Sequence, residues 1–168
     1  MSVISVEKNP ESLSLTMVAQ FQASVKNVWR MWSDPRLLER WWGPPTYPAT
    51  FVDHELAPDG RMTYYMTSPE GEKYHGWWRI VSVDEPREIE FADGFSDDSG
   101  VPDESMPTTS TRVSIDEVAP GLIRMTLISI FPSLEAMEQL EAMGMVEGYT
   151  EAISQIDALL EEVSSANS

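Results

Sequence analysis

A tryptophan-rich stretch of the chain reads Val28-Trp29-Arg30-Met31-Trp32-Ser33-Asp34-Pro35, and Trp41-Trp42-Gly43-Pro44-Pro45 follows it closely. Its four tryptophans fall within fourteen residues. A buried indole ring is bulky and its N–H needs an acceptor, so such a cluster beside a chain turn marks a wall or a mouth. Ser24 and Asp34 are favoured N-caps, and Gly43 followed by prolines ends a helix. The stretch therefore predicts two short helices with tryptophans on their buried faces.

Segments in which apolar and polar residues alternate surround this stretch, and turn residues separate them. A period of two is typical of strands with one buried face. The pattern is clearest where Met62, Tyr64 and Met66 share one face. The predicted strands cover residues 12–22, 50–56, 61–67, 73–83, 88–92, 109–118 and 122–131.

The end of the chain has a different period. Residues 133–163 carry apolar side chains at spacings of three and four, which predicts one long amphipathic helix, with a kink or break expected at Gly144. Residues 93–107 are rich in Asp, Gly, Ser and Pro, which predicts a long loop that is either mobile or a lid. We further expect a flexible N-terminus over residues 1–11, a single domain over 12–163 and a disordered tail over 164–168.

The order of these elements predicts an α+β, helix-grip type of architecture. One curved antiparallel sheet of about six to seven strands would wrap around the long C-terminal helix, and the two short helices would follow the first strand. Where the sheet and the helix do not meet completely, a cavity remains between them. Its methionine and aromatic side chains suit an irregular pocket.

Charge and composition narrow the classes of partner. Eleven Lys and Arg against 28 Asp and Glu give a net charge of −17. A surface of that sign repels phosphate backbones and anionic lipid, so we expect neither nucleic acid nor a membrane as a partner. No apolar run approaches the roughly 18 residues that span a bilayer, and residues 1–11 show no secretory signal. The chain has no cysteine, which is compatible with the cytoplasm, the location we expect.

The sequence holds no recognisable catalytic constellation. Its only histidines are His54 and His75, and two histidines without cysteine make a poor zinc set, so we expect no metal and no cofactor. The acidic residues of 93–107 lack the ligand spacing and fixed glycine of an EF-hand, which favours a solvated loop over a calcium site. Neither a nucleophile elbow nor a phosphate-binding loop is present.

Four motifs carry a family resemblance, and they are Val28-Trp29-x-x-Trp32-x-Asp34-Pro35, Trp41-Trp42-Gly43-Pro44, Gly60-x-Met62-x-Tyr64-x-Met66-x-x-Pro69-x-Gly71 and Pro86-Arg87-x-Ile89-x-Phe91. With the element order, they resemble the SRPBCC superfamily, the START-like helix-grip proteins that share the birch-pollen-allergen fold. The chain is similar to its single-domain bacterial branch, which resembles the C-terminal domain of heat-shock-chaperone ATPase activators. The resemblance covers residues 12–163. Because these motifs are mainly structural, no catalytic residue carries over.

The resemblance implies a deep apolar cavity between the sheet and the long helix. Relatives bind lipids, hormones or polyketides, so we expect a small hydrophobic or aromatic molecule as the partner. Of the neighbours Trp77 and Trp78, the strand register favours Trp78 as the inward one. A homodimer stays open as the assembly state. The residues that we expect to line the cavity are Trp29, Trp42, Met62, Tyr64, Met66, Trp78, Phe91, Val113, Met125, Leu127, Met143, Tyr149 and Ile153.

Two other functions stay open. Some relatives cyclise polyketides, and a cyclase- or aromatase-like enzyme needs only positioning and one group that polarises a carbonyl. The candidates for that group are Tyr64, His75, Arg112 and Tyr149, although core packing or solvent exposure explains each of them as well. A chaperone-activator-like interaction protein would use an anionic outer face of the last helix. That face consists of Glu135, Glu138, Glu141, Glu147 and Glu151, and a solvated helix surface explains the same pattern.

Overall fold

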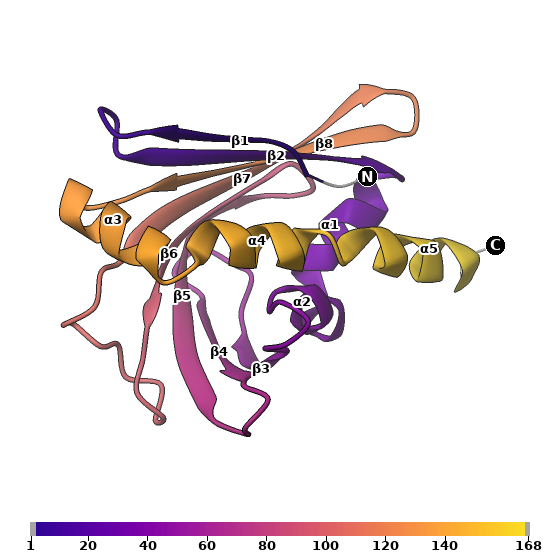
Figure 1. The fold of residues 1–168 in the computed structure, drawn as a ribbon. Coiled ribbons are helices and arrows are strands. Elements are labelled where there is room, and N and C mark those ends of the chain that lie inside the picture. The colour runs from indigo at the N-terminus through magenta and orange to yellow at the C-terminus, as the bar shows by residue number, and fades with distance from the viewer. Residues whose placement is uncertain (1–2, 167–168) are drawn as a thin grey trace.

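One antiparallel sheet curves around a row of helices in the computed structural model, which describes residues 3–166 (Figure 1). The sheet has eight strands in the order β1-β2-β8-β7-β6-β5-β4-β3, and each neighbouring pair is antiparallel. The strands are β1 (Val3–Asn9), β2 (Ser14–Gln22), β3 (Ala49–His54), β4 (Arg61–Thr67), β5 (Lys73–Asp84), β6 (Glu88–Phe95), β7 (Thr109–Ala119) and β8 (Leu122–Ile130). The predicted α+β helix-grip architecture is confirmed.

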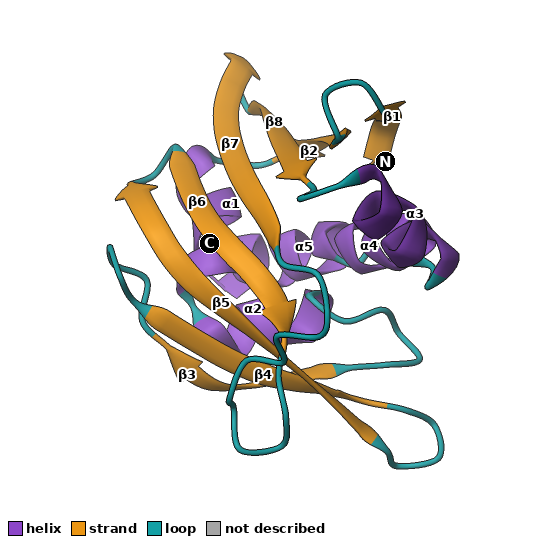
Figure 2. Ribbon diagram, turned by 90° about the vertical axis from the view of Figure 1, so that its left-hand side faces the viewer, coloured by secondary structure: helices purple, strands orange, loops and turns teal. Residues whose placement is uncertain are grey.

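Two short helices follow β2, as the sequence predicts. In α1 (Val25–Ser33), the Ser24 side chain accepts a hydrogen bond from a backbone N–H of the first turn. In α2 (Pro35–Trp41), Asp34 does the same. These caps satisfy N–H groups that have no partner inside a helix. Both helices lie on the concave side of the sheet (Figure 2).

The C-terminal helical region is divided into α3 (Leu134–Ala142), α4 (Met145–Ile153) and α5 (Ile156–Ala166). The predicted break at Gly144 is confirmed, because this residue has φ 88°, a left-handed conformation that favours glycine. A second interruption, between α4 and α5, was not expected. The three helices run one after another across the concave side of the sheet (Figure 1).

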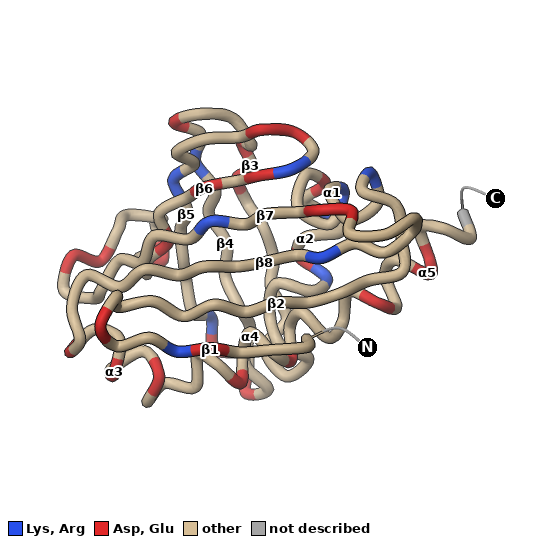
Figure 3. The backbone as a smooth tube through the Cα atoms, turned by 90° about the horizontal axis from the view of Figure 1, so that it is seen from above, with Lys and Arg blue, Asp and Glu red and all other residues tan. Residues whose placement is uncertain are grey.

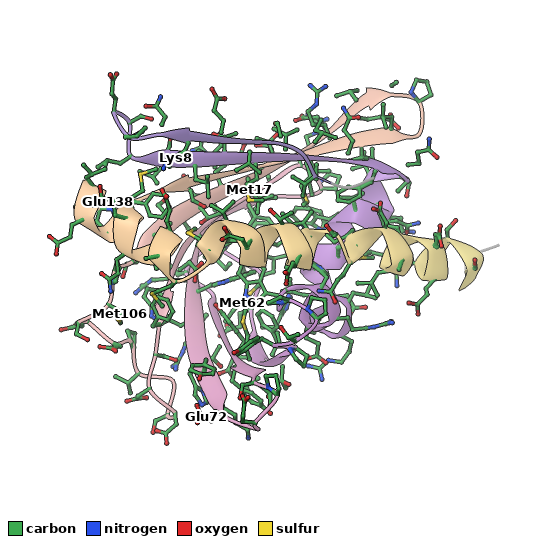
Figure 4. All side chains as sticks on the ribbon, viewed as in Figure 1. Lys8, Met17, Met62, Glu72, Met106 and Glu138 are labelled. Carbon is green, nitrogen blue, oxygen red and sulfur yellow. The ribbon has the colours of Figure 1, made fainter. Side chains whose placement is uncertain are left out.

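An aromatic cluster fills the space between α1, α2 and the sheet. Trp32 and Trp41 make an edge contact, with ring centroids 4.8 Å apart. Trp78 stacks on Phe91 at 4.1 Å, and its indole is 1% exposed, so the inward orientation predicted for Trp78 is correct. Methionines complete the core, as Met62 shows beneath the helices in Figure 4. Buried aromatic rings contribute large contact areas and preferred edge or stacked geometries to stability.

The N-terminal prediction is wrong for Val3–Asn9, because these residues form β1 and pair with β2. This edge strand is exposed along most of its length, so its side chains carry no alternation that would reveal it. Its backbone hydrogen bonds and an ion pair from Lys8 to Glu141 of α3, at 3.1 Å, hold it in place. Of the predicted disordered tail, residues 164–166 belong to α5 and residues 167–168 lie outside the described part.

The acidic loop is shorter than predicted. Residues 93–95 continue β6, and the loop proper begins at Ser96. Arg61 on the outer side of the sheet donates a hydrogen bond to the Gly100 carbonyl oxygen at 2.9 Å. The Gly100 part of the loop therefore rests on the outer side of β4, while Met106 near its end lies 3.9 Å from the side-chain amide of Gln139 in α3.

The two glycines of the α3–α4 region give opposite predictions. In Gly144→Ala, an alanine must adopt φ 88°, where its Cβ is strained against the backbone. We therefore expect the free energy of unfolding to fall by about 1 kcal/mol. Gly148 lies inside α4, where an added Cβ meets no atom within 4 Å. Gly148→Ala should raise the free energy of unfolding by up to about 1 kcal/mol, because alanine is the better helix former. Urea unfolding measures both, and equal signs would contradict the helix break.

Candidate functional site

A cavity of about 510 Å³ lies between the concave side of the sheet and the α3–α4 break. Its walls come from the segment after α2, from β4, β6 and the start of β7, and from α3 and α4. Most lining side chains are apolar or aromatic. The lining residues are Trp42, Pro44, Thr46, Tyr47, Tyr64, Met66, Asp93, Gly94, Phe95, Pro107, Thr109, Leu140, Met143, Gly144, Met145, Glu147, Gly148, Tyr149 and Glu151.

Three aromatic rings form one wall of the cavity. Trp42 makes edge contacts with Tyr149, with ring centroids 5.5 Å apart, and with Tyr64 at 6.2 Å. On its other side, Trp42 contacts Trp78 at 4.7 Å, so the wall continues directly into the aromatic core. The side chains that pack behind this wall are therefore buried in the core.

The position of Tyr64 depends on a glycine in the neighbouring strand. Tyr64 of β4 pairs with Gly76 of β5, and a Cβ at Gly76 would lie 2.5 Å from the tyrosine hydroxyl oxygen. The phenol ring thus lies over the bare backbone of Gly76, a common way for an aromatic side chain to cover a strand glycine. The indole N–H groups of Trp42 and Trp78 approach this hydroxyl without reaching hydrogen-bond geometry.

Asp93 of β6 is a half-buried acidic residue in the lining of the cavity. Burial raises its pKa to about 7, and no neighbouring cation or hydrogen-bond donor counteracts this effect. The same burial raises the pKa of Tyr64 and of Tyr149 well above the ordinary value, and the Asp93 charge raises both further. Near neutral pH, both phenols are therefore neutral while Asp93 is divided between its acid and its carboxylate.

Tyr149 reaches from α4 towards the middle of the sheet. The hydroxyl groups of Thr111 in β7 and Ser129 in β8 lie beside its phenol and lower its pKa in part. These two hydroxyls are themselves buried and lie 3.4 Å apart. The Tyr149 phenol of α4 therefore has polar neighbours on the sheet.

The mouth of the cavity is acidic. Glu147 and Glu151 lie on α4 at its rim, and both are exposed. Together with Asp93 they give the lining three carboxyl groups, and none of its residues is Lys, Arg or His. Over the whole chain, acidic positions are spread across the loops, strand ends and helices, and basic ones are fewer (Figure 3). Any charged ligand entering here meets a negative potential.

Of the predicted lining residues, five surround the cavity: Trp42, Tyr64, Met66, Met143 and Tyr149. The other eight are not among its lining residues and pack in the core instead. They are Trp29, Met62, Trp78, Phe91, Val113, Met125, Leu127 and Ile153. The prediction identified the inward faces of strands and helices correctly, but it could not tell which part of the inward surface the helices cover.

The sequence interpretation missed Asp93 because it placed this residue in the acidic loop. The signal was available in the strand pattern. Ile89 and Phe91 are both buried, and Asp93 is the next residue on the same face of β6. If the alternation of Ile89 and Phe91 is continued by two residues, it predicts that the Asp93 side chain points to the inward face.

The other candidate groups lie elsewhere. The Nε2 atom of His54 lies 3.0 Å from the Trp32 carbonyl oxygen. His75 is outside the cavity lining, and Arg112 is exposed and forms an ion pair with Glu90 at 2.9 Å. Over residues 3–166, no group of three or more His, Asp and Glu side chains is arranged to hold a metal ion.

The predicted anionic face of the last helix is not one surface. Glu141 forms its ion pair with Lys8, while Glu147 and Glu151 lie at the cavity mouth. Glu135 and Glu138 are exposed on α3, at the far end of the helical row. Within the described residues, no helix is long and apolar enough to cross a membrane.

Comparisons with known proteins agree with this fold. The family model of activator of Hsp90 ATPase homolog 1-like proteins matches residues 22–161. A protein from Arthrobacter aurescens, solved by NMR, is 49% identical with a TM-score of 0.91, and the match covers 96% of this chain and 93% of that one. The crystal structure of Ms6760 from Mycobacterium smegmatis is 46% identical with a TM-score of 0.87, covering 94% and 96%.

A more distant match shows the fold alone. DynU16, described as a putative protein in the dynemicin biosynthetic locus, is 15% identical with a TM-score of 0.60. The match covers 86% of this chain and 47% of that one. No curated protein matches the chain.

The raised pKa of Asp93 predicts a specific pH dependence of stability. The carboxyl has a pKa of about 7 when folded and an ordinary value of 3.8 when unfolded, so the folded chain binds this proton more tightly. This group therefore lowers the free energy of unfolding as the pH rises from about 4 to 7, and the loss is complete above that range. Between pH 5 and pH 8, the free energy of unfolding of Asp93→Asn should rise by roughly 2.5 kcal/mol relative to that of the parent chain. Denaturant unfolding at both pH values measures it, and an unchanged difference would contradict the buried carboxyl.

Proposed function

Because the chain belongs to the family of activator of Hsp90 ATPase homolog 1-like proteins and a shared fold does not fix one activity, we propose its function from the cavity, which binds a small hydrophobic or aromatic molecule. The observation that carries this proposal is a volume of about 510 Å³ lined mainly by apolar and aromatic side chains. Ligand pockets in proteins typically have volumes of about 300–1,000 Å³ and walls of this kind.

The mouth supports access to this cavity. Met143 is 56% exposed at the break between α3 and α4, and it also lines the cavity. An unbranched thioether side chain adapts to ligands of different shape. Gly144 and Gly148 lie beside it and add no side chain to the lining. A molecule can therefore enter between the two helices without unfolding the sheet.

A second candidate function is acid–base catalysis on a carbonyl compound bound in the same cavity. It is favoured by the Asp93 carboxyl, whose pKa of about 7 suits proton transfer near neutral pH, and by the two neutral phenols of Tyr64 and Tyr149. Such an enzyme would lose turnover in Asp93→Asn while ligand affinity stayed within a few-fold. A pure binding protein would show no turnover in either form.

We also propose the cytoplasm as the location. The chain carries no cysteine that would need an oxidising compartment. An intracellular binding protein would meet apolar metabolites there.

Gly148 offers a direct test of binding. An added side chain at this position points into open space beside the cavity, so Gly148→Phe should fill the cavity without a backbone clash. We expect the neutral fluorescent dye N-phenyl-1-naphthylamine to bind the parent chain and to lose at least tenfold in affinity in Gly148→Phe. The matched control Gly148→Ala should retain affinity within about twofold. The proposal is overturned if the dye binds Gly148→Phe as tightly as Gly148→Ala. It is also overturned if the parent chain does not bind the dye.

A further inference from the structure

The Asp93 carboxyl group has no hydrogen-bond or ion-pair partner in the part of the chain that the structure describes. No hydrogen bond or ion pair from its side chain exists within residues 3–166, and burial alone accounts for its shifted pKa. Asp93 is half-buried, and a carboxylate that has lost part of its hydration without gaining a partner is costly. A nearby positive charge offsets that cost. Since the carboxyl faces the cavity, the missing partner has room to come from a bound molecule.

The aromatic wall fits a cation as well as an apolar body. The rings of Trp42, Tyr64 and Tyr149 meet edge to face beside Asp93. The faces of tryptophan and tyrosine rings attract ammonium groups, and the attraction increases where water is excluded. Both phenols stay neutral, so they do not compete with the carboxylate for a cation.

The acidic mouth of the cavity also favours a cationic ligand over an anionic one. Glu147 and Glu151 place two exposed carboxylates where a ligand must pass, and no basic side chain lines the cavity to receive an anion. A fatty acid or another carboxylate would therefore lose its hydration without gaining a counter-charge. The same potential raises the local concentration of cations at the rim.

We propose that the natural ligand of this cavity is an amphipathic amine, with a flat apolar body against Trp42, Tyr64 and Tyr149 and a protonated nitrogen at the Asp93 carboxylate. This inference rests on the proposed binding function and names its ligand class. The apolar lining supplies affinity for the body, and the single internal carboxylate selects the charge.

Three probes with the same ring system separate the contributions: 2-naphthylmethylamine, 2-naphthylmethanol and 2-naphthoate. By isothermal titration at pH 7.5, we expect the amine to bind at least tenfold more tightly than the alcohol, and 2-naphthoate to bind most weakly. Asp93→Asn should reduce the amine preference to less than about threefold and leave the affinity for the alcohol within twofold. The control Glu161→Gln removes an exposed carboxylate of α5 that is outside the lining, and it should change neither value.

The outcomes separate this inference from the proposed function. If the alcohol binds the parent chain but the amine shows no preference, or if Asp93→Asn keeps the preference, the amine assignment is overturned while binding of apolar molecules stands. Tightest binding of 2-naphthoate overturns it as well. If none of the three probes binds, both the ligand class and the binding function are overturned.

Discussion

The packing of the Trp42 ring between the sheet and the C-terminal helices sets the spacing of the other elements. The ring lies at the end of α2 and touches Trp78 of the core sheet on one side and Tyr149 of α4 on the other. The backbone beside it is fixed by Gln155, whose side-chain amide donates to the carbonyl oxygens of Trp41 and Gly43 at 3.3 and 2.7 Å. One indole thus sets the distance between the short helices, the sheet and the C-terminal helices. That distance decides how much space remains for a ligand.

The cavity follows from where the C-terminal helical row is broken. The left-handed Gly144 separates α3 from α4, and an uninterrupted helix there would present a continuous set of side chains to the sheet. Packing is close to complete in the aromatic core, where Trp32, Trp41 and Trp78 are almost fully buried. The opening is therefore confined to one end of the concave side.

Most of the architecture could be predicted because local signals and packing agree. Strand β4 has the predicted bounds of residues 61–67, since its alternation is regular and turns flank it. The capped helices α1 and α2 were equally clear. Strand β1 could not be found this way, because backbone pairing to β2 holds it while its side chains remain exposed. Composition also hid Asp93, because an acidic, glycine-rich segment resembles a loop even where a strand continues through it.

The site was harder to predict than the fold, because the inward face of a strand is visible in the sequence but the extent of the helices covering it is not. Met62 and Met66 share a face of β4, yet Met62 is fully buried in the core and only Met66 borders the cavity.

An NMR titration of the ¹⁵N-labelled chain with 2-naphthylmethanol would show where a ligand binds. We expect chemical-shift changes concentrated at the amides of Tyr64, Gly94, Gly148 and Tyr149. Changes confined to the outer side of the sheet, or none at saturating probe, would contradict a ligand cavity at the α3–α4 break.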